Sequence, residues 1–350
     1  MARNNDLGKA KVAKADEFYT QKVDIENELH YYADYFEGKT VYCNCDDPKE
    51  SEFWQFFVRN FKPWKLKKLI ATHYEPDENT CSYKLELTAD TVNSEPIKTP
   101  LSCNGDFRSD ECIEILKEAD VVVTNPPFSL WREYVAQLVE YNKHFVIIGN
   151  INAITYKEIF PLLKDNKMWL GQSIHSGDRA FYVPDDYPLK ASGCGIDETG
   201  RKYVRVKGVR WFTNIDIPQR HTKLDLRGVY YSSDIYSKYD NYDAIHIEKV
   251  ADIPCDYEGE MGVPINFLDS YNPEQFEILG LTSLAETMPT PVQLGKEFIE
   301  KYRAAGGTGH YSANMYKVAY FDKNGKAKVP YGRILVKNKH PQERTNKNEN

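Results

Sequence analysis

Apolar and polar residues follow each other along this chain with two different periods. Stretches with apolar residues three or four positions apart predict amphipathic helices, and short continuous apolar runs predict strands buried on both faces. From the amino end to about residue 170 the two patterns take turns. Strands that alternate with helices are typical of an α/β domain built on a parallel, doubly wound sheet, and this is the fold class that we expect.

The expected elements follow from these patterns and from the residues that interrupt them. Helices are expected at residues 24–36, 53–58, 109–118 with Ser109 as N-cap, 130–141, 156–164 and 291–305. Strands are expected at 40–44, 66–72, 121–123, 144–149, 168–170 and 333–336, with a short strand or turn at 101–107. Residues 82–100 are polar and predict no defined element.

The valine strand at 121–123 runs into a rigid corner, Asn125-Pro126-Pro127-Phe128. The prolines restrict the backbone, and the carboxyl end of a strand is where open α/β sheets bind ligands. The Asn125 side-chain oxygen and the Pro126 carbonyl are two acceptors for a planar amino group, and the Phe128 ring offers a face for a flat base. The alternative is a plain strand-ending turn, since Asn-Pro and Pro-Pro are ordinary breakers.

Composition sets broad limits on what the chain can be. Its 350 residues, of which 41% are hydrophobic, suffice for a catalytic domain and a second unit. No apolar run is long enough to cross a bilayer and the amino end leads into no signal-like core, so we expect no membrane partner and a cytoplasmic location. Seven scattered cysteines without a Cys-x-x-Cys pair predict neither a disulfide framework nor a metal site.

The corner Asn125–Phe128 resembles the catalytic motif of amino-group methyltransferases that use S-adenosylmethionine. This cofactor has no phosphate to hold, and the turn after Asn44 has no Gly-x-Gly. Asp46 or Asp47 could meet the cofactor's ammonium group, while Asp106 could accept from its adenine amino group and Phe107 could pack on the adenine ring. Taken singly, each acidic residue is also ordinary turn chemistry.

Longer blocks of the chain resemble the EcoRI-type adenine-specific (N6) DNA methyltransferases. These blocks are Asp-Glu-Phe-Tyr-Thr-Gln at 16–21, Val-Tyr-Cys-Asn-Cys-Asp-Asp-Pro at 41–48, Gly-Asp-Phe-Arg-Ser at 105–109, Val-Val-Thr-Asn-Pro-Pro-Phe-Ser at 122–129, Lys-Tyr-Asp-Asn-Tyr-Asp-Ala-Ile at 238–245 and Met-Gly-Val-Pro-Ile at 261–265. The resemblance implies a Rossmann-like S-adenosylmethionine-dependent methyltransferase sheet with a carboxyl-terminal target-recognition region.

The resemblance also assigns site residues. It implies catalytic roles for Asn125, Pro126, Pro127 and Phe128, and cofactor binding by Phe18, Tyr19, Thr20, Cys43, Asn44, Asp46, Asp106 and Phe107. The family's cysteine-containing turn at 43–46 departs from the glycine-rich turn of many methyltransferases. Glu75 is the nearest candidate for the acidic residue that binds the ribose.

A basic segment at 201–227 is the expected DNA-binding surface. It holds eight Lys or Arg against two Asp, in a chain whose net charge is −7. The residues that we expect to contact phosphates are Arg201, Lys202, Arg205, Lys207, Arg210, Arg220 and Lys223. The alternative is a hairpin with a solvated basic face, because Lys-Tyr-Val-Arg-Val-Lys alternates at strand period.

The domain organisation that we expect has four parts. Residues 1–15 form a mobile leader, 16–170 the S-adenosylmethionine-binding catalytic domain, 171–339 the target-recognition and DNA-binding region packed on it, and 340–350 a disordered tail. The glycine cluster Gly306-Gly307-Thr308-Gly309 follows a helix rather than opening one, so we interpret it as a linker and not as a phosphate loop.

The expected function is methyl transfer from S-adenosylmethionine to a flipped-out adenine in duplex DNA. The resemblance implies a restriction–modification or DNA-protection context, a short palindromic target such as GAATTC, and a restriction endonuclease acting on the same site without a physical complex. Alternatives are a cytosine-N4 methyltransferase, a protein glutamine methyltransferase and a catalytically silent DNA-binding protein. Cytosine-C5 chemistry would need a cysteine nucleophile, and we interpret the one Pro-Cys, at Cys255, as a structural thiol.

Overall fold

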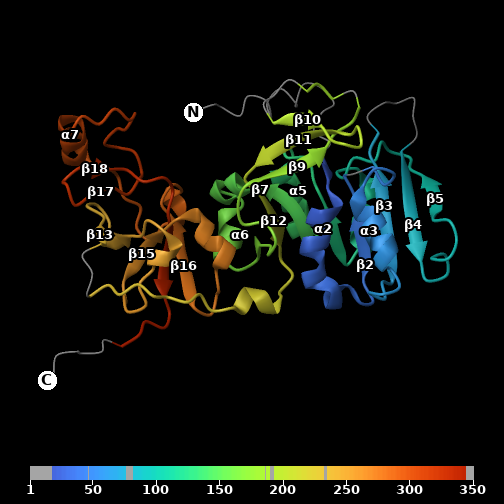
Figure 1. Cartoon of the computed structure of the whole chain (residues 1–350), viewed down its shortest axis with the longest axis horizontal. Helices are drawn as coiled ribbons and strands as arrows, with labels where there is room; N and C mark the ends of the chain where they lie inside the picture. Colours follow the sequence, from blue (N-terminus) through green and yellow to red (C-terminus); the bar gives the residue numbers. More distant parts are fainter. Residues whose placement is uncertain are drawn as a thin grey trace. The chain divides into compact units, whose positions relative to one another are not determined.

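The computed structural model describes residues 18–45, 47–75, 82–185, 187–189, 193–231 and 235–343. The predicted leader, the cofactor candidate Asp46 and residues 344–350 of the predicted tail lie outside this part. The chain forms two compact units: residues up to Ala153 with Met168–Ile217, and Ile154–Lys167 with the residues from Pro218 onward (Figure 1). The predicted ranges 16–170 and 171–339 are functional assignments, and they stay predictions.

The first unit is built on an eight-stranded sheet in the order β5-β4-β3-β2-β6-β7-β12-β8. Its strands are β2 (Thr40–Cys43), β3 (Lys68–His73), β4 (Tyr83–Thr88), β5 (Ile97–Pro100), β6 (Val121–Thr124), β7 (His144–Asn150), β8 (Trp169–Leu170) and β12 (Val209–Thr213). The four central strands β3, β2, β6 and β7 are parallel, as predicted. The sheet as a whole is mixed rather than parallel as predicted, because β4, β5 and β12 each pair antiparallel with their neighbours.

The missed strands have a physical explanation. In β4, Leu85 and Leu87 alternate with Lys84 and Glu86, which is the pattern of a half-buried antiparallel strand. Glu86 forms ion pairs with Lys84, at 2.9 Å, and with Lys68 on the neighbouring strand. The polar residues that hid this strand in the sequence therefore satisfy one another on its surface.

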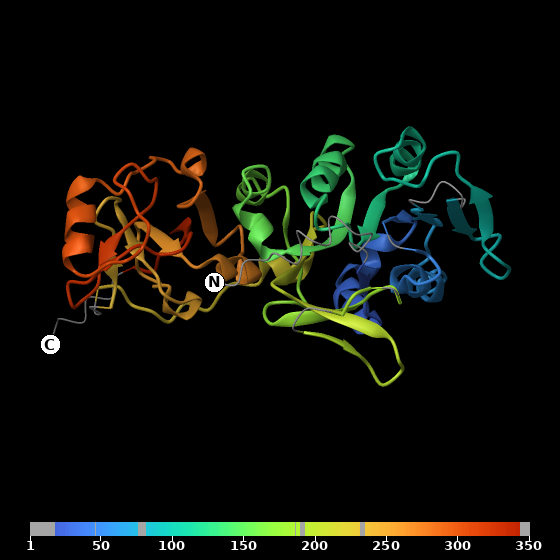
Figure 2. The ribbon, with the colours of Figure 1, turned by 90° about the horizontal axis from the view of Figure 1, so that it is seen from above.

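Helices cover both faces of the sheet. The helix α2 (Lys22–Leu29), which continues as the 3-10 helix η1 (His30–Phe36), and the helix α3 (Glu52–Asn60) pack on one face and share an apolar core with the sheet. The helices α4 (Asp110–Glu118) and α5 (Trp131–Glu140) lie on the opposite face (Figure 2). Ser109 caps α4 as predicted, since its hydroxyl accepts a hydrogen bond from the amide of Cys112. The segment 101–107 is a turn rather than a strand.

A second, four-stranded sheet belongs to the same unit. It has the order β1-β9-β11-β10, with β1 (Tyr19–Thr20), β9 (Asp178–Tyr182), β10 (Cys194–Ile196) and β11 (Lys202–Lys207). All of its pairings are antiparallel, and Tyr19 is opposite Tyr182. The amino-terminal segment is thus joined to a strand that follows it by about 160 residues, a contact that no local pattern predicts.

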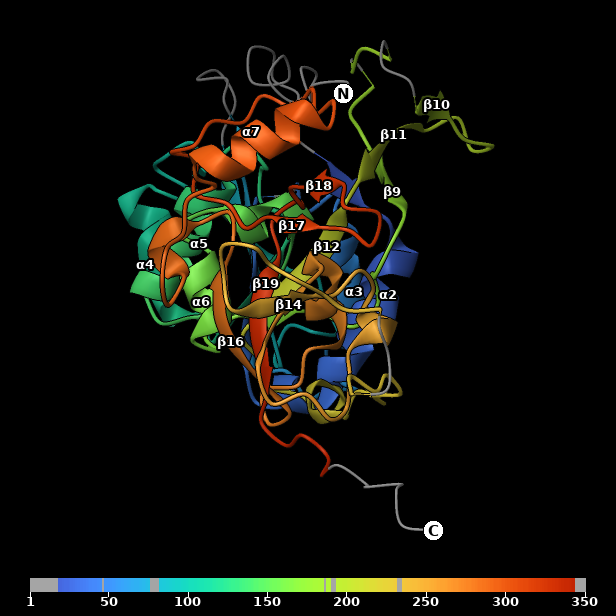
Figure 3. The same ribbon diagram turned by 90° about the vertical axis from the view of Figure 1, so that its left-hand side faces the viewer.

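The second unit contains a five-stranded sheet in the order β13-β14-β15-β19-β16. Its strands are β13 (Ser237–Lys238), β14 (Ala244–His246), β15 (Glu260–Val263), β16 (Phe276–Leu281) and β19 (Ile334–Asn338), and its helices are α6 (Phe160–Lys164) and α7 (Lys296–Ala304). A hairpin of β17 (Tyr320–Phe321) and β18 (Ala327–Lys328) lies beside α7 (Figure 3). The remaining 3-10 helices are η2 (Ile151–Thr155), η3 (Pro218–His221), η4 (Val250–Asp252), η5 (Ile265–Ser270) and η6 (Ala285–Thr287).

Two predicted helices are shorter in the structure than their apolar pattern indicates. The helix predicted at 291–305 begins at Lys296, because Gly295 has a φ of 78°, which lies outside the helical region. The helix predicted at 156–164 begins at Phe160, with Pro161 in its first turn. Across the described residues, no helix has the length and hydropathy that crossing a bilayer demands.

Candidate functional site

The carboxyl ends of β2 and β6 mark the point where the strand order of the sheet reverses. From β2 the chain continues to β3 on one side, and it later returns to β6 on the other side of β2. At such a point in an α/β sheet, the loops that leave the two strands run apart and form a crevice that binds ligands. Asn44 follows β2 and Asn125 follows β6, so the fold brings these two predicted residues to the same edge.

The side chain of Asn125 is buried and is only half satisfied. It is 5% exposed, and its Nδ2 donates a hydrogen bond to the carbonyl oxygen of Phe18. Its Oδ1 is also buried and has no hydrogen-bond partner within the described residues. A buried polar atom without a partner costs about 1–3 kcal/mol, so such an atom in a native structure calls for an explanation, and a bound ligand is one. The Oδ1 atom is an acceptor available to a ligand that carries N–H groups.

An aromatic cluster surrounds the ring of Phe128. The ring centroids of Phe18 and Phe181 lie 5.9 Å and 6.4 Å from it, and the ring of Tyr187 lies 6.4 Å from that of Phe18. The sequence analysis missed Phe181 and Tyr187, because they follow the corner by more than fifty residues and reach it only through the pairing of β9 with β1. The cluster provides flat apolar surface next to the buried amide oxygen.

Asn44 is fixed by two hydrogen bonds from other elements. Its Oδ1 accepts from the hydroxyl of Tyr134 on α5, and its carbonyl oxygen accepts from the Thr124 hydroxyl at the end of β6. Burial raises the pKa of Tyr134 well above its ordinary value, so this hydroxyl remains a donor at neutral pH. Asn44 therefore connects the turn after β2 to the end of β6 and to α5.

The other cofactor-binding candidates near the amino end differ in which groups they could offer to a ligand. The Cys43 side chain is 3% exposed and belongs to the apolar core, so only its backbone could contact a ligand. Phe18, Tyr19 and Thr20 are buried as well. The hydroxyl of Thr20 has no hydrogen-bond partner within the described residues, which makes it a second unsatisfied polar atom in the segment that receives Asn125.

The turn at 104–107 lies directly against the end of β3. The amide of Glu75 donates to the carbonyl oxygen of Asn104 at 2.8 Å. A Cβ atom on Gly105 would lie 2.2 Å from the carbonyl oxygen of His73, and Gly105 has a φ of +79°. Only glycine allows so close an approach in this conformation.

Asp106 and Phe107 follow this glycine. Asp106 forms an ion pair of 2.7 Å with Arg108, and the hydrogen bond from Arg108 lowers the pKa of the carboxyl group, which stays ionised as an acceptor. The ring of Phe107 is 6% exposed and packs edge-on against Tyr134 with centroids 5.0 Å apart.

Glu75 lies in a cluster of polar side chains that the sequence analysis did not identify as one group. His73, the last residue of β3, has its Nε2 3.7 Å from the Glu75 carboxylate and its Nδ1 3.6 Å from the carboxylate of Asp47. The hydroxyl of Tyr83 donates to Asp47 at 3.3 Å. These residues come from the carboxyl ends of β2 and β3 and from the start of β4. The sequence feature that could have identified this cluster is that its residues lie at the ends of strands.

The predicted DNA-binding residues belong to both units. On β11 and next to it, Arg205 forms an ion pair with Asp178 at 2.9 Å, and Arg201 lies 3.6 Å from Glu50 and stacks on the ring of Tyr182. Lys207 is exposed. The ammonium group of Lys202 donates to the carbonyl oxygens of Asp185 and Tyr187.

The other three residues of this set lie elsewhere. Arg210 on β12 is 4% exposed, and its guanidinium donates to the carbonyl oxygens of Val209 and His175. The structure therefore contradicts the prediction that Arg210 contacts phosphate, because strand pairing turns this side chain inward. In the second unit, Arg220 donates to the side chain of Asn166 at 2.7 Å, and Lys223 is exposed.

Comparisons with known proteins give a consistent set of relatives. A family model described as "Adenine-specific methyltransferase EcoRI" matches residues 6–339. The Type II methyltransferase M.EcoRI of Escherichia coli is 43% identical, over 97% of this chain and 98% of that protein. Two mycoplasma proteins, Type II methyltransferase M.MgeORF184P of Mycoplasma genitalium and M.MpnI of Mycoplasma pneumoniae, are 42% and 40% identical, each over 78% of this chain and over 85% and 84% of their own lengths. The chain belongs to the EcoRI family of adenine-specific methyltransferases.

Proposed function

We propose that this chain transfers a methyl group from S-adenosyl-L-methionine to the N6 atom of an adenine in duplex DNA. Family membership supports the adenine and the DNA. The observation that carries the chemistry is the buried Oδ1 of Asn125, which has no partner within the described residues and lies next to the aromatic cluster around Phe128. An amino group on a flat ring is the ligand that satisfies both features.

Residues at the edge of the first unit's sheet fit the cofactor. We assign the methionine end of the cofactor to the segment Phe18–Thr20, where the Thr20 hydroxyl has no hydrogen-bond partner within the described residues. We assign its nucleoside to the turn at 105–107 and to Glu75. The parallel core with helices on both faces and a strand-order reversal supports a Rossmann-like assignment. When bound, the cofactor supplies a methyl group on a positively charged sulfur, an electrophile for an amino nitrogen.

The chain's own residues orient that nitrogen. Asn125 Oδ1 and the Pro126 carbonyl accept its two hydrogens, which draws the lone pair away from the ring's conjugation and directs it out of the ring plane. The hydrogen bond from Asn125 Nδ2 to Phe18 holds the amide before the substrate arrives, so the acceptor is positioned in advance. The prolines at 126 and 127 keep the backbone of this corner rigid.

The adenine must leave the base stack to reach this corner. Unstacking costs a few kcal/mol. Stacking on Phe128 in the aromatic cluster offsets part of that cost. We assign DNA binding to the exposed basic residues of β11 and of the carboxyl-terminal region, and we keep target recognition for residues 171–339 as a proposal. A cytoplasmic location and a restriction endonuclease acting on the same site also remain proposals.

Two observations weigh against other methyl acceptors. Cys255 is buried, and burial raises the pKa of its thiol, which is the opposite of what a nucleophile for cytosine C5 needs. The family is adenine-specific, which disfavours cytosine N4 and protein glutamine.

Asn125→Ala tests the assignment. We expect loss of the amide oxygen to lower the methyl-transfer rate by roughly two to three orders of magnitude, in line with removal of one positioned hydrogen-bonding group in other active sites. Calorimetry should show cofactor affinity nearly unchanged. Asn60→Ala is the matched control, because Asn60 also donates its Nδ2 to a backbone carbonyl, that of Phe56, but lies on α3.

Full turnover by Asn125→Ala would remove Asn125 from the mechanism. Product analysis tests the substrate independently. Hydrolysis of methylated DNA to nucleosides should yield N6-methyl-2′-deoxyadenosine, and N4-methyl-2′-deoxycytidine in its place would overturn the adenine assignment.

A further inference from the structure

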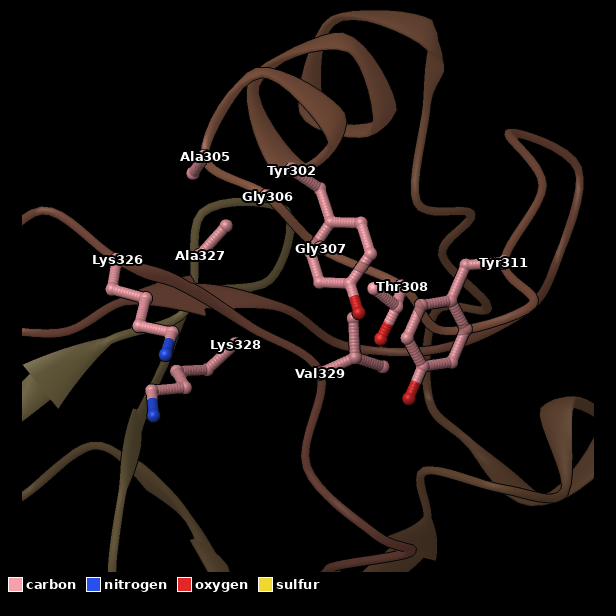
Figure 4. A pocket seen from close by; sticks show the side chains of 10 residues that line it. All are labelled: Tyr302, Ala305, Gly306, Gly307, Thr308, Tyr311, Lys326, Ala327, Lys328 and Val329. Atoms are coloured by element: carbon pink, nitrogen blue, oxygen red, sulfur yellow. The ribbon is translucent and has the colours of Figure 1, made fainter.

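The pocket beside α7 collects polar groups that the proposed mechanism does not use. It has a volume of about 280 Å³ and lies between the end of α7 and β18 (Figure 4). Its polar side chains are those of Tyr302, Thr308, Lys326 and Lys328. The two lysines extend away from the two hydroxyls, so these donors do not converge on one ligand. The amides of Gly306 and Gly307 donate to carbonyl oxygens at the end of α7, so the glycine cluster is not a phosphate loop.

The polar cluster at the end of β3 differs from this pocket, because its members contact one another. The side chain of His73 is 18% exposed and has a carboxylate beside each ring nitrogen. Its Nδ1 lies 3.6 Å from Asp47 and its Nε2 lies 3.7 Å from Glu75. Both separations exceed a hydrogen bond, and the buried Nδ1 has no hydrogen-bond partner within the described residues. A shift of about half an ångström would let a ring N–H donate to either acid.

Asp47 is held in place by other members of the cluster. Its carboxylate accepts hydrogen bonds from the Tyr83 hydroxyl at 3.3 Å and from the backbone amide of Lys49 at 2.9 Å. Burial raises the pKa of Tyr83 above its ordinary value, so this hydroxyl keeps its proton and donates. The ring of Tyr83 also lies beside that of His73, with centroids 5.1 Å apart. Asp47 and Tyr83 therefore fix the imidazole from one side.

The backbone around His73 is fixed by the turn at 104–107. The carbonyl oxygen of His73 lies against Gly105, and the amide of Glu75 donates to the carbonyl oxygen of Asn104 at 2.8 Å. The side chain of Glu75 is 23% exposed. Its carboxylate therefore lies beside the imidazole on a fixed backbone and is still accessible to a ligand.

A carboxylate that binds two neighbouring hydroxyls must keep both of its oxygens in one orientation. A glutamate side chain has several rotatable bonds, so fixing it costs conformational entropy. Asp47 and Glu75 also carry like charges at the two nitrogens of one ring, and like charges repel. An imidazole between them can donate an N–H to Glu75, which restricts that carboxylate and offsets the repulsion.

We propose that His73 is a positioning residue of the nucleoside site, which orients the Glu75 carboxylate for the ribose hydroxyls of the cofactor. This inference rests on the proposed function, since it takes S-adenosylmethionine to be the methyl donor and Glu75 to be its ribose ligand. Asp47 and Tyr83 orient the imidazole, much as the aspartate of a catalytic triad orients its histidine.

Steady-state kinetics of His73→Phe test the proposal. Phenylalanine keeps a ring that can pack on Tyr83 but removes both nitrogens. We expect KM for S-adenosylmethionine to rise roughly tenfold, the loss expected when one hydrogen-bonding partner is removed. The kcat at saturating cofactor and the KM for DNA should stay within about twofold of wild type. His73→Gln, whose side-chain amide can replace the Nε2 donor, should recover most of the cofactor affinity.

A double-mutant cycle shows whether His73 acts through Glu75. In a Glu75→Ala background, His73→Phe should raise KM for the cofactor by less than about twofold further, because the carboxylate that it positions is gone. The matched control is His144→Phe, which removes an exposed imidazole at the amino end of β7, at the opposite edge of the parallel strands. This control should leave KM unchanged.

An unchanged KM in His73→Phe, with a wild-type protein that binds the cofactor and methylates DNA, overturns this inference and leaves the proposed function intact. An undiminished effect of His73→Phe without Glu75, or an equal rise of KM in the His144→Phe control, overturns it as well. A fall in kcat together with the rise in KM, not recovered by His73→Gln, would assign His73 a structural role and reject positioning. A wild-type protein that neither binds S-adenosylmethionine nor methylates DNA overturns both proposals.

Discussion

At the scale of single residues, the candidate site contains two asparagines whose side-chain nitrogen and oxygen have different hydrogen-bonding roles. Asn125 uses its nitrogen to bind the Phe18 carbonyl, and its buried oxygen has no hydrogen-bond partner within the described residues. In Asn44 the side-chain oxygen already has a partner, because it accepts a hydrogen bond from the Tyr134 hydroxyl. We propose that Asn125 acts on a ligand, whereas Asn44 stabilises the turn after β2.

Tyr134→Phe tests the stabilising role. Removal of the hydroxyl leaves the buried Asn44 oxygen without its donor, so we expect the free energy of unfolding to fall by about 1–3 kcal/mol in urea denaturation. Tyr141→Phe, at the C-cap of the same helix and partly exposed, should change it by less than about 0.5 kcal/mol. Equal stability of the two variants would mean that Asn44 finds another donor.

At the scale of elements, the turns at strand ends carry the site, and their backbone conformations decide how closely they can pack. The turn at 104–107 contacts the end of β3 through Gly105, whose missing side chain makes room for the His73 carbonyl. That contact brings Asp106 and Phe107 next to Glu75, which is bonded to the same turn. The proposed nucleoside site is therefore assembled from two elements by one glycine.

Gly105→Ala should damage both fold and binding. Gly105 and Gly38 both have positive φ, at +79° and +71°, but nothing lies within 4 Å of a Cβ on Gly38. Gly38→Ala should therefore cost only the backbone strain, about 1–2 kcal/mol of unfolding free energy. Gly105→Ala adds a clash with backbone, and we expect a further loss of about 1–3 kcal/mol.

Cofactor binding separates the two glycine variants further. Calorimetry should show weaker S-adenosylmethionine binding for Gly105→Ala and wild-type affinity for Gly38→Ala. If both variants bound the cofactor as wild type does, the turn at 104–107 would not belong to its site.

At the scale of the whole molecule, charge is distributed unevenly. The chain is acidic overall, with a net charge of −7, yet β11 presents Arg205 and Lys207 at alternate, exposed positions. Residues two apart on a strand face the same side, so these two cations share one face of β11, where Asp178 pairs with Arg205 and Lys207 is exposed. Such a face allows an acidic protein to approach DNA locally.

Arg205→Gln/Lys207→Gln should weaken DNA binding in a salt-dependent way. Loss of one or two phosphate contacts lowers the slope of log K against log salt by about 1 to 2. The pair Lys62→Gln/Lys65→Gln, exposed on the connection between α3 and β3, is the control and should leave the slope unchanged. The same slope for both pairs would exclude β11 from the DNA-binding surface.

The sequence by itself determined the features that depend on local chemistry. The valine run, the prolines of the corner and the Ser109 cap constrain neighbouring residues directly, so the parallel core, the end of β6 before Asn125 and the start of α4 were predicted correctly. The family blocks identified the reaction class for the same reason, because they are contiguous stretches of chain.

Only the tertiary structure decided what depends on contacts between distant segments. Phe18, which binds the side chain of Asn125, is 107 residues away from it in sequence. Phe181 reaches the aromatic cluster because β9 pairs with β1. Arg210 points inward because β12 pairs with the main sheet. The strands β4 and β5 were missed because both carry polar residues, which in β4 form ion pairs within the strand and with Lys68 of β3. The spacing of apolar residues predicts whether a segment is a helix or a strand. Which strands it pairs with and which side chains are buried depend on the other segments that contact it in the fold.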